Sequence, residues 1–136
     1  MVFGIFKKKP DKVNKAVESI SALLDIQLSL CDWNAHKLST DNWALGYIFG
    51  FHDAFLQALQ INDQDKSLLV FMGSYERLFD QTGMASELFR QSLGLQKENR
   101  FKTGMLEGGK EAMKFLGDQT PCLGLAKRLQ RGSENR

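Results

Sequence analysis

The chain is poor in residues that break helices or build covalent frameworks. It has 136 residues but only two prolines, Pro10 and Pro121, and both lie near its ends. The absence of proline between Pro10 and Pro121 favours long helices over a β structure with many turns. The two cysteines, Cys31 and Cys122, set no disulfide framework. Unlinked thiols and the lack of a secretory signal predict a reducing, cytoplasmic location.

A long hydrophobic run at the N-terminus is also missing. The apolar residues 1–6 are too few to span a bilayer, and they precede Lys7, Lys8 and Lys9, which reverses the order of a signal peptide. We therefore expect residues 1–10 to be a flexible segment, or a short strap whose aromatic side chains dock on the domain. The alternative is weak, reversible contact of residues 1–9 with an anionic membrane surface.

A strong charge of one sign is absent, since the net charge is only +2. Both ends are basic and the middle of the chain is acidic. The basic residues near the C-terminus, Lys127, Arg128 and Arg131, have no aromatic residues interleaved with them and no helix-turn-helix signature. A solvated surface is the simpler interpretation, so we do not expect a nucleic acid as the partner.

Apolar residues recur at helical spacing along most of the chain. The pattern predicts six helices, at about residues 11–36, 41–61, 64–81, 84–93, 96–116 and 121–131. This is an all-α, single-domain bundle over residues 11–131, with residues 132–136 as a disordered tail. The second helix is apolar almost all round and carries five aromatic residues. We expect it to be buried on most sides, either centrally or in an oligomer interface.

Two of the predicted helices carry the same pattern of small residues. The pattern consists of Gly46, Gly50 and Ala54 in the second helix and Gly104, Gly108 and Ala112 in the fifth. The two segments align without a gap, and in this alignment Asp53 corresponds to Glu111. Each interior glycine weakens a helix by about 1 kcal/mol relative to alanine, which calls for a reason. Close crossing of the two helices, in one chain or across a dimer axis, is the structural interpretation. A slot that admits a ligand, edged by Asp53 and Glu111, is the functional one.

No catalytic motif, zinc motif, calcium loop or phosphate loop survives inspection of the sequence. His52 lies beside Asp53, but consecutive helical residues point about 100° apart and do not pair directly. A hydrogen-bonded core histidine is therefore favoured over acid–base chemistry at His52. The sequence predicts no cofactor and no metal site.

The pattern as a whole favours a non-enzymatic interaction or regulatory module that acts through protein–protein contacts. A homodimer is expected, because the aromatic second helix offers more hydrophobic surface than six short helices easily cover. The alternative is a sensor of a small molecule or metal, with an acidic pocket between the second, third and fifth helices. His52, Asp53, Glu76 and Glu111 would supply its polar contacts.

Overall fold

The protein is all-helical, as the apolar spacing predicts. The structure is a computed structural model that describes the backbone of residues 11–134 and the side chains of residues 11–130. Within that range it contains no strand, and its helices are α2 (Lys12–Ser29), α3 (Ala35–Ser39), α4 (Asn42–Ala58), α5 (Gln64–Phe79), the 3₁₀ helix η1 (Asp80–Thr82), α6 (Ala85–Gly94), α7 (Asn99–Asp118) and α8 (Gly124–Glu134). The expectations for residues 1–10 and 135–136 lie outside the described residues.

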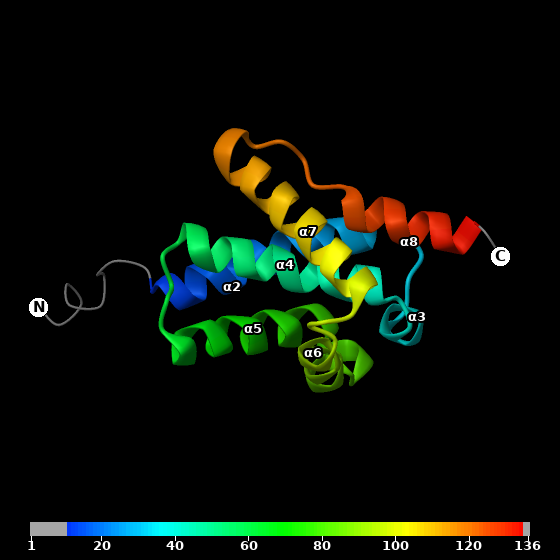
Figure 1. Ribbon diagram of the computed structural model, residues 1–136, viewed down its shortest axis with the longest axis horizontal. Coiled ribbons are helices and arrows are strands. Elements are labelled where there is room, and N and C mark those ends of the chain that lie inside the picture. The colour runs from blue at the N-terminus through cyan, green and yellow to red at the C-terminus, as the bar shows by residue number, and fades with distance from the viewer. Residues whose placement is uncertain (1–10, 135–136) are drawn as a thin grey trace, which may run out of the picture.

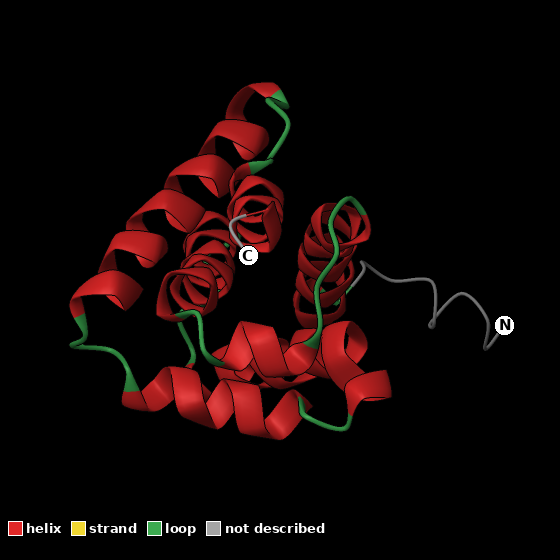
Figure 2. Cartoon of the chain, turned by 90° about the vertical axis from the view of Figure 1, so that its right-hand side faces the viewer, coloured by secondary structure: helices red, strands yellow, loops and turns green. Residues whose placement is uncertain are grey.

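Helix α4 lies at the centre of the bundle (Figure 1). Helices α2, α4 and α5 run along the long axis of the molecule, and α7 crosses α4 obliquely (Figures 1 and 2). The inner side chains of α4 are aromatic, and rings from α5 and α6 join them: Phe49 packs on Phe71, and Phe71 packs on Phe89. Residues 44–52 of α4 are all buried. The prediction of a central, mostly buried second helix is confirmed.

Most helix starts are set by local capping residues. The side chains of Asp11, Asn34, Asp41, Asp63 and Glu98 each accept a hydrogen bond from a backbone N–H in the first turn of the helix that follows. Such a bond satisfies one of the otherwise unpaired N–H groups of a helix start. This is why the run of capping residues before α4 marks a break that is visible in the sequence.

The first helix is shorter than its apolar stripe predicts. Helix α2 ends at Ser29 rather than near residue 36, and a separate short helix, α3, follows. Asn34 is extended and its side chain accepts a bond from the Lys37 N–H, so it starts a new helix instead of continuing the old one. A side chain that competes for the backbone in this way is a common reason for a helix to end.

The last helix begins later and ends later than predicted. Thr120 does not cap it, because its N–H and hydroxyl both bond to the Asp118 carboxylate. Helix α8 begins at Gly124, three residues after Pro121, and its backbone continues to Glu134, into the predicted disordered tail. Its first N–H groups are capped by side chains from distant helices, which the sequence cannot reveal.

Candidate functional site: the crossing of α4 and α7 and its open groove

Helices α4 and α7 are in backbone contact through four glycines. A Cβ atom on Gly46 or Gly50 would lie within 3.0 Å of the carbonyl oxygen of Phe101 or Met105, respectively. A Cβ atom on Gly104 or Gly108 would meet the carbonyl oxygen of Trp43 or Tyr47 in the same way. Only glycine permits so close an approach, which also brings Cα–H groups to carbonyl oxygens. The glycines explain how the two helices cross so tightly.

The contacts repeat when the two helices exchange roles. Gly46 faces Phe101 and Gly104 faces Trp43, and the step from 46 to 104 equals the step from 43 to 101. Gly50 with Met105 and Gly108 with Tyr47 follow the same rule. Residue numbers rise together on both helices, so α4 and α7 run in the same direction. The crossing therefore has an approximate two-fold axis, and each side of α4 corresponds to a side of α7.

One side of this crossing is filled by a buried polar network. The Tyr47 hydroxyl donates to Glu111 Oε1 at 2.5 Å and accepts from Gln27 Nε2 of α2 at 3.0 Å. Gln27 Oε1 accepts the N–H groups of Leu125 and Ala126, and Glu111 Oε1 accepts that of Gly124. Helix α2 and the start of α8 are thus held against Tyr47 and Glu111. Burial and the Glu111 carboxylate together hold the pKa of Tyr47 well above its usual value.

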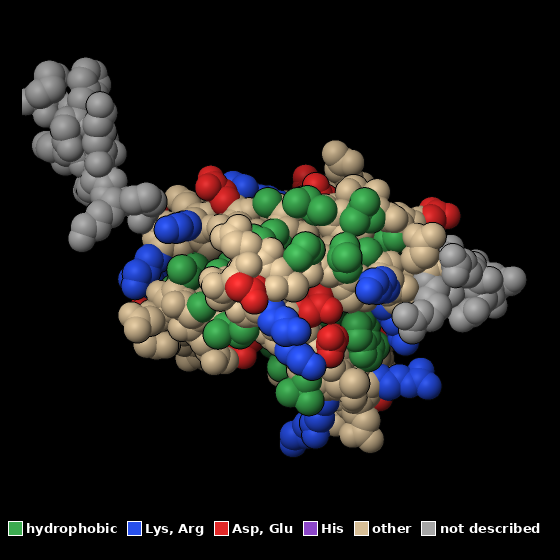
Figure 3. Space-filling model, turned by 90° about the horizontal axis from the view of Figure 1, so that it is seen from above, with side chains coloured by type: hydrophobic (Ala, Val, Ile, Leu, Met, Phe, Trp, Pro, Cys, Tyr) green, Lys and Arg blue, Asp and Glu red, His purple; other side chains and the backbone are tan. Residues whose placement is uncertain are grey.

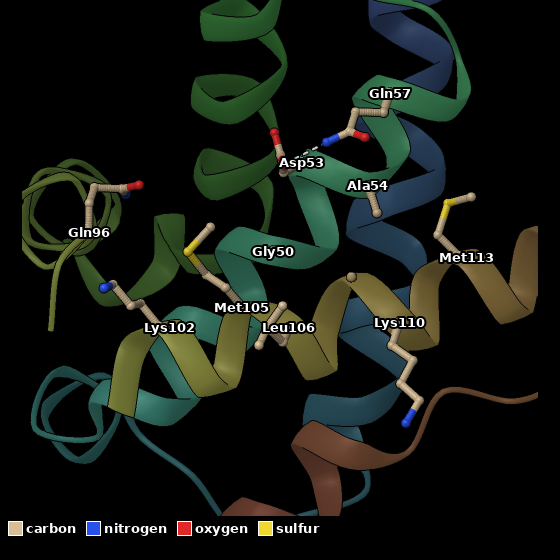
Figure 4. A pocket seen from close by; sticks show the side chains of 11 residues that line it. Gly50, Asp53, Ala54, Gln57, Gln96, Lys102, Met105, Leu106, Lys110 and Met113 are labelled. Atoms are coloured by element: carbon tan, nitrogen blue, oxygen red, sulfur yellow. Dashed lines mark hydrogen bonds between the residues drawn. The ribbon is translucent and has the colours of Figure 1, made fainter. Parts of the chain in front are cut away.

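The other side of the crossing is an open groove of about 670 Å³. Figure 4 shows residues of α4 at one edge and residues of α7 along the other. The lining is mostly apolar and consists of Gly50, Asp53, Ala54, Gln57, Gln96, Lys102, Met105, Leu106, Gly109, Lys110 and Met113. We call this the α4–α7 groove.

The groove exposes a face of α7 whose counterpart on α4 is buried. Under the two-fold relation Leu106 corresponds to Ile48 and Met113 corresponds to Phe55. Ile48 and Phe55 are 0% and 2% exposed, whereas Leu106 and Met113 are 76% and 52% exposed. The buried face of α7 consists of Phe101, Gly104, Gly108 and Ala112, and several of its large apolar residues lie outside that face.

Charged side chains stand at both edges of the groove. Lys102 and Lys110 are exposed on the α7 side. Asp53 is half-buried on the α4 side and accepts a hydrogen bond from Gln57 Nε2 at 2.9 Å (Figure 4). On the face seen from above, exposed hydrophobic side chains lie in groups between lysine or arginine and acidic side chains (Figure 3). The groove is thus an apolar strip with a basic outer edge.

His52 is a core residue and lies outside the groove. It is fully buried, its Nδ1 lies 2.7 Å from the Ile48 carbonyl oxygen and its Nε2 lies 2.8 Å from Ser74 Oγ. Since a carbonyl can only accept, Nδ1–H donates to Ile48 and the Ser74 hydroxyl donates to Nε2. Burial lowers the pKa of His52 to about 4. A serine–histidine pair with no exposed surface holds α4 against α5 rather than meeting a substrate.

The four residues predicted to share an acidic pocket lie in four different places. Asp53 lines the α4–α7 groove, and Glu76 is exposed on a small hollow between α5 and α6. Glu111 faces α8 from the opposite side of α7, and His52 is in the core. The structure therefore does not bring these four side chains together, because α4, α5 and α7 turn them toward different neighbours. Of the small residues, Ala112 is fully buried, and Ala54 lies 3.9 Å from a Cβ built on Gly109.

Sequence reasoning missed two sets of residues that the structure makes prominent. Gln27 looks like an ordinary polar residue of an amphipathic helix, yet it is fully buried and bonds two other helices. Leu106 and Met113 are large apolar residues of α7, yet both are exposed. No local signal identifies Gln27. Leu106 could have been noticed, because it does not share the face of α7 that carries the glycines.

Cys122 carries no sign of an activated thiol. It precedes α8 instead of lying in its first turn, and its thiol donates to the Glu111 carbonyl oxygen at 3.5 Å. Burial and the nearby Glu111 carboxylate raise the pKa of Cys122 to about 11. In the described part of the chain no three metal-binding side chains come together, and no helix has the length and apolar character needed to cross a membrane.

Comparisons with known proteins add no relative. No protein family, no curated protein and no solved structure matches this chain.

Proposed function

We propose that this protein is a helix-binding interaction module, and that its α4–α7 groove receives an amphipathic helix from a protein partner. The observation that carries the proposal is that two equivalent faces, one on α4 and one on α7, are buried to very different extents. On α4 the face that includes Ile48 and Phe55 is covered by other helices, whereas on α7 the equivalent face, with Leu106 and Met113, is open. Equivalent faces are therefore treated differently: other helices cover the face on α4, and no described part of the chain covers the face on α7.

The shape and chemistry of the groove fit a helix better than a small polar ligand. Gly109 is half-buried in the lining of the groove and carries no side chain, so the side chains of an incoming helix can approach the backbone of α7 there. Met105 and Met113 line it with flexible, polarisable side chains, which adapt well to apolar partners. Amphipathic helices commonly bind proteins by laying an apolar face in such a groove.

The exposed leucine gives the groove an anchor. Leu106 is 76% exposed, and burying one such side chain contributes about 2 kcal/mol. Binding energy at interfaces is concentrated in a few central apolar side chains, with polar residues at the rim. Leu106 and Met113 lie two helical turns apart on α7, so a partner helix with apolar residues at the same interval would contact both.

The proposal is tested by selecting helical peptides from a displayed library on the folded protein. We expect enrichment of amphipathic sequences whose binding is lost in the Leu106→Asp variant. The matched control is Leu30→Asp, since Leu30 is also more than half exposed but lies outside the groove, at the end of α2. Circular dichroism and thermal unfolding check that both variants fold.

Amide chemical shifts locate the selected peptides independently of the variants. Bound peptides should shift the resonances of Gly50, Ala54 and Gly109 and leave those of α8 unchanged. A library that yields no binder sensitive to Leu106→Asp, or binders that map elsewhere, would overturn the proposal.

A further inference from the structure

The outward face of α5 is an amphipathic surface that nothing in the described chain covers. Asp65, Leu69, Met72 and Glu76 follow one another at intervals of four, three and four residues, so they share one face of the helix. All four are exposed, and Leu69 and Met72 are each more than half exposed. This acidic α5 face therefore has an apolar centre with a carboxylate at each end.

The α4–α7 groove presents the opposite arrangement of charge. Along α7, Leu106 lies between Lys102 and Lys110, and Met113 follows three residues after Lys110. These lysines are eight positions apart, about 12 Å along the helix, and Asp65 and Glu76 are about 16 Å apart. Lysine side chains are long and flexible enough to make up the difference. Each surface has an apolar centre between two charged side chains, the two surfaces are similar in length, and their charges are opposite in sign.

Resting on the proposed function, we infer that the helix received by the groove is α5 of a second copy of this chain, in a reciprocal two-fold dimer. Leu69 and Met72 of one copy pack around Leu106 of the other, and the carboxylates at the two ends of the acidic α5 face lie against Lys102 and Lys110. A two-fold axis makes the same contact twice, because each copy carries one α5 face and one groove.

The reciprocal contact accounts for five of the ten large hydrophobic side chains that are exposed in the described part of the chain. Leu68, Leu69 and Met72 of α5 and Leu106 and Met113 of α7 are all between 46% and 76% exposed. Contiguous exposed apolar surface on a soluble domain usually marks an interaction site. Two contacts of this kind in one dimer bury both surfaces together.

The decisive experiment is a charge exchange between the two surfaces, measured by sedimentation equilibrium on the full chain. The wild type should be a dimer at micromolar concentration. The groove variant K102E/K110E and the α5 variant D65K/E76K should each dissociate, with dissociation constants raised at least about tenfold, because like charges then face each other. An equimolar mixture of the two variants should recover the dimer, since both contacts in the mixed pair again join opposite charges.

The controls separate surface effects from misfolding. All four positions are exposed, so circular dichroism and thermal unfolding should match the wild type for each variant. The variant K12E/K15E reverses two exposed lysines at the start of α2 and should leave the dimer unchanged. Rising salt should weaken the wild-type dimer, as expected for charge pairs at a rim.

Three outcomes would overturn the dimer. A wild type that stays monomeric at about 100 µM has no such interface. A D65K/E76K variant that dimerises like the wild type shows that α5 is not the occupant, and a growing series of larger species shows that the contact does not close on itself. If the wild type is monomeric but the groove still selects peptides that depend on Leu106, the proposed function stands and only this inference fails.

Discussion

Gly108 of α7 lies directly against the carbonyl oxygen of Tyr47 on α4, with no room between them for a Cβ atom. The same relationship holds for Gly50 and Met105 on the opposite side of the crossing. Gly108 packs on the backbone of Tyr47, and the hydroxyl of the same tyrosine donates to Glu111, which also accepts the Gly124 N–H at the start of α8. Close backbone packing and the polar network therefore depend on each other at one residue.

The glycines at the crossing should tolerate no side chain, whereas a neighbouring glycine should. Gly50→Ala places a methyl group against the Met105 backbone, which cannot move away, and we expect a loss of about 3 kcal/mol in the free energy of unfolding. Gly109→Ala is the matched control, because its Cβ would lie 3.6 Å from the nearest atom, at ordinary contact distance. That variant should be as stable as the wild type or gain up to about 1 kcal/mol from helix propensity. Urea unfolding measures both, and equal stability of the two variants would contradict the close crossing.

Stability should fall in acid because of His52. The folded protein keeps this histidine neutral until its pKa of about 4, whereas the unfolded chain takes up the proton near its ordinary pKa of 6.5. Between these values the unfolded state binds more protons, so stability rises with pH through this window and is constant above it as far as His52 is concerned. The full effect is about 3 kcal/mol.

Urea unfolding at a series of pH values between 4.5 and 7.5 measures this dependence. The His52→Gln variant, whose amide can replace both hydrogen bonds, should show a much flatter dependence on pH. A wild type and variant with parallel pH profiles would mean that folding does not lower the pKa of His52.

Removing the Gln27 side-chain amide should loosen α8 specifically. Gln27→Leu leaves the N–H groups of Leu125 and Ala126 and the Tyr47 hydroxyl without their buried partner. We expect a loss of about 3 kcal/mol and faster amide hydrogen exchange in α8, while α4 and α5 keep their protection. Gln57→Leu is the control, because Gln57 is exposed and bonds only to Asp53 on its own helix. Uniform loss of protection in every helix would show that Gln27 supports the whole core instead.

Cys122 should react slowly with thiol reagents. With its pKa raised to about 11, only about one thiol in a thousand is ionised at pH 8, and the side chain is buried as well. In a Cys31→Ser variant, the remaining thiol should react with Ellman's reagent at least tenfold more slowly than glutathione, and at the normal rate once urea unfolds the chain. A fast reaction in the folded protein would show that the thiol is activated.

Local features explain which parts of the fold could be predicted. The helices α4, α5, α6 and α7 begin and end within a few residues of their predicted ends, because capping residues and breaks lie next to them in the chain. The burial of α4 follows from aromatic residues on nearly all its sides. The spacing of Gly46, Gly50, Gly104 and Gly108 pointed to a close crossing of two helices, and the structure has these glycines at such a crossing.

Contacts between distant residues explain the rest. The start of α8 depends on Gln27 and Glu111, which lie far from it in sequence, and the local signal at Thr120 and Pro121 was misleading. The acidic residues proposed for one pocket are separated because Asp53, Glu76 and Glu111 lie on three different helices whose packing turns them toward different sides. Whether Leu106 is buried also depends on which helix covers α7, and hydrophobic spacing alone carries no such information.

The sequence by itself determined that the chain is helical, that one helix is buried on nearly all sides and that two helices carry stripes of glycine and alanine. These properties are set by composition and by the helical period, which act over a few residues. Only the tertiary structure decided that one side of the α4–α7 crossing is closed by Gln27 and α8 while the other remains an open groove. The physical reason is that hydrophobic burial is non-directional, so an apolar face can pack against any apolar surface. The packing of the whole chain then determines which faces are covered.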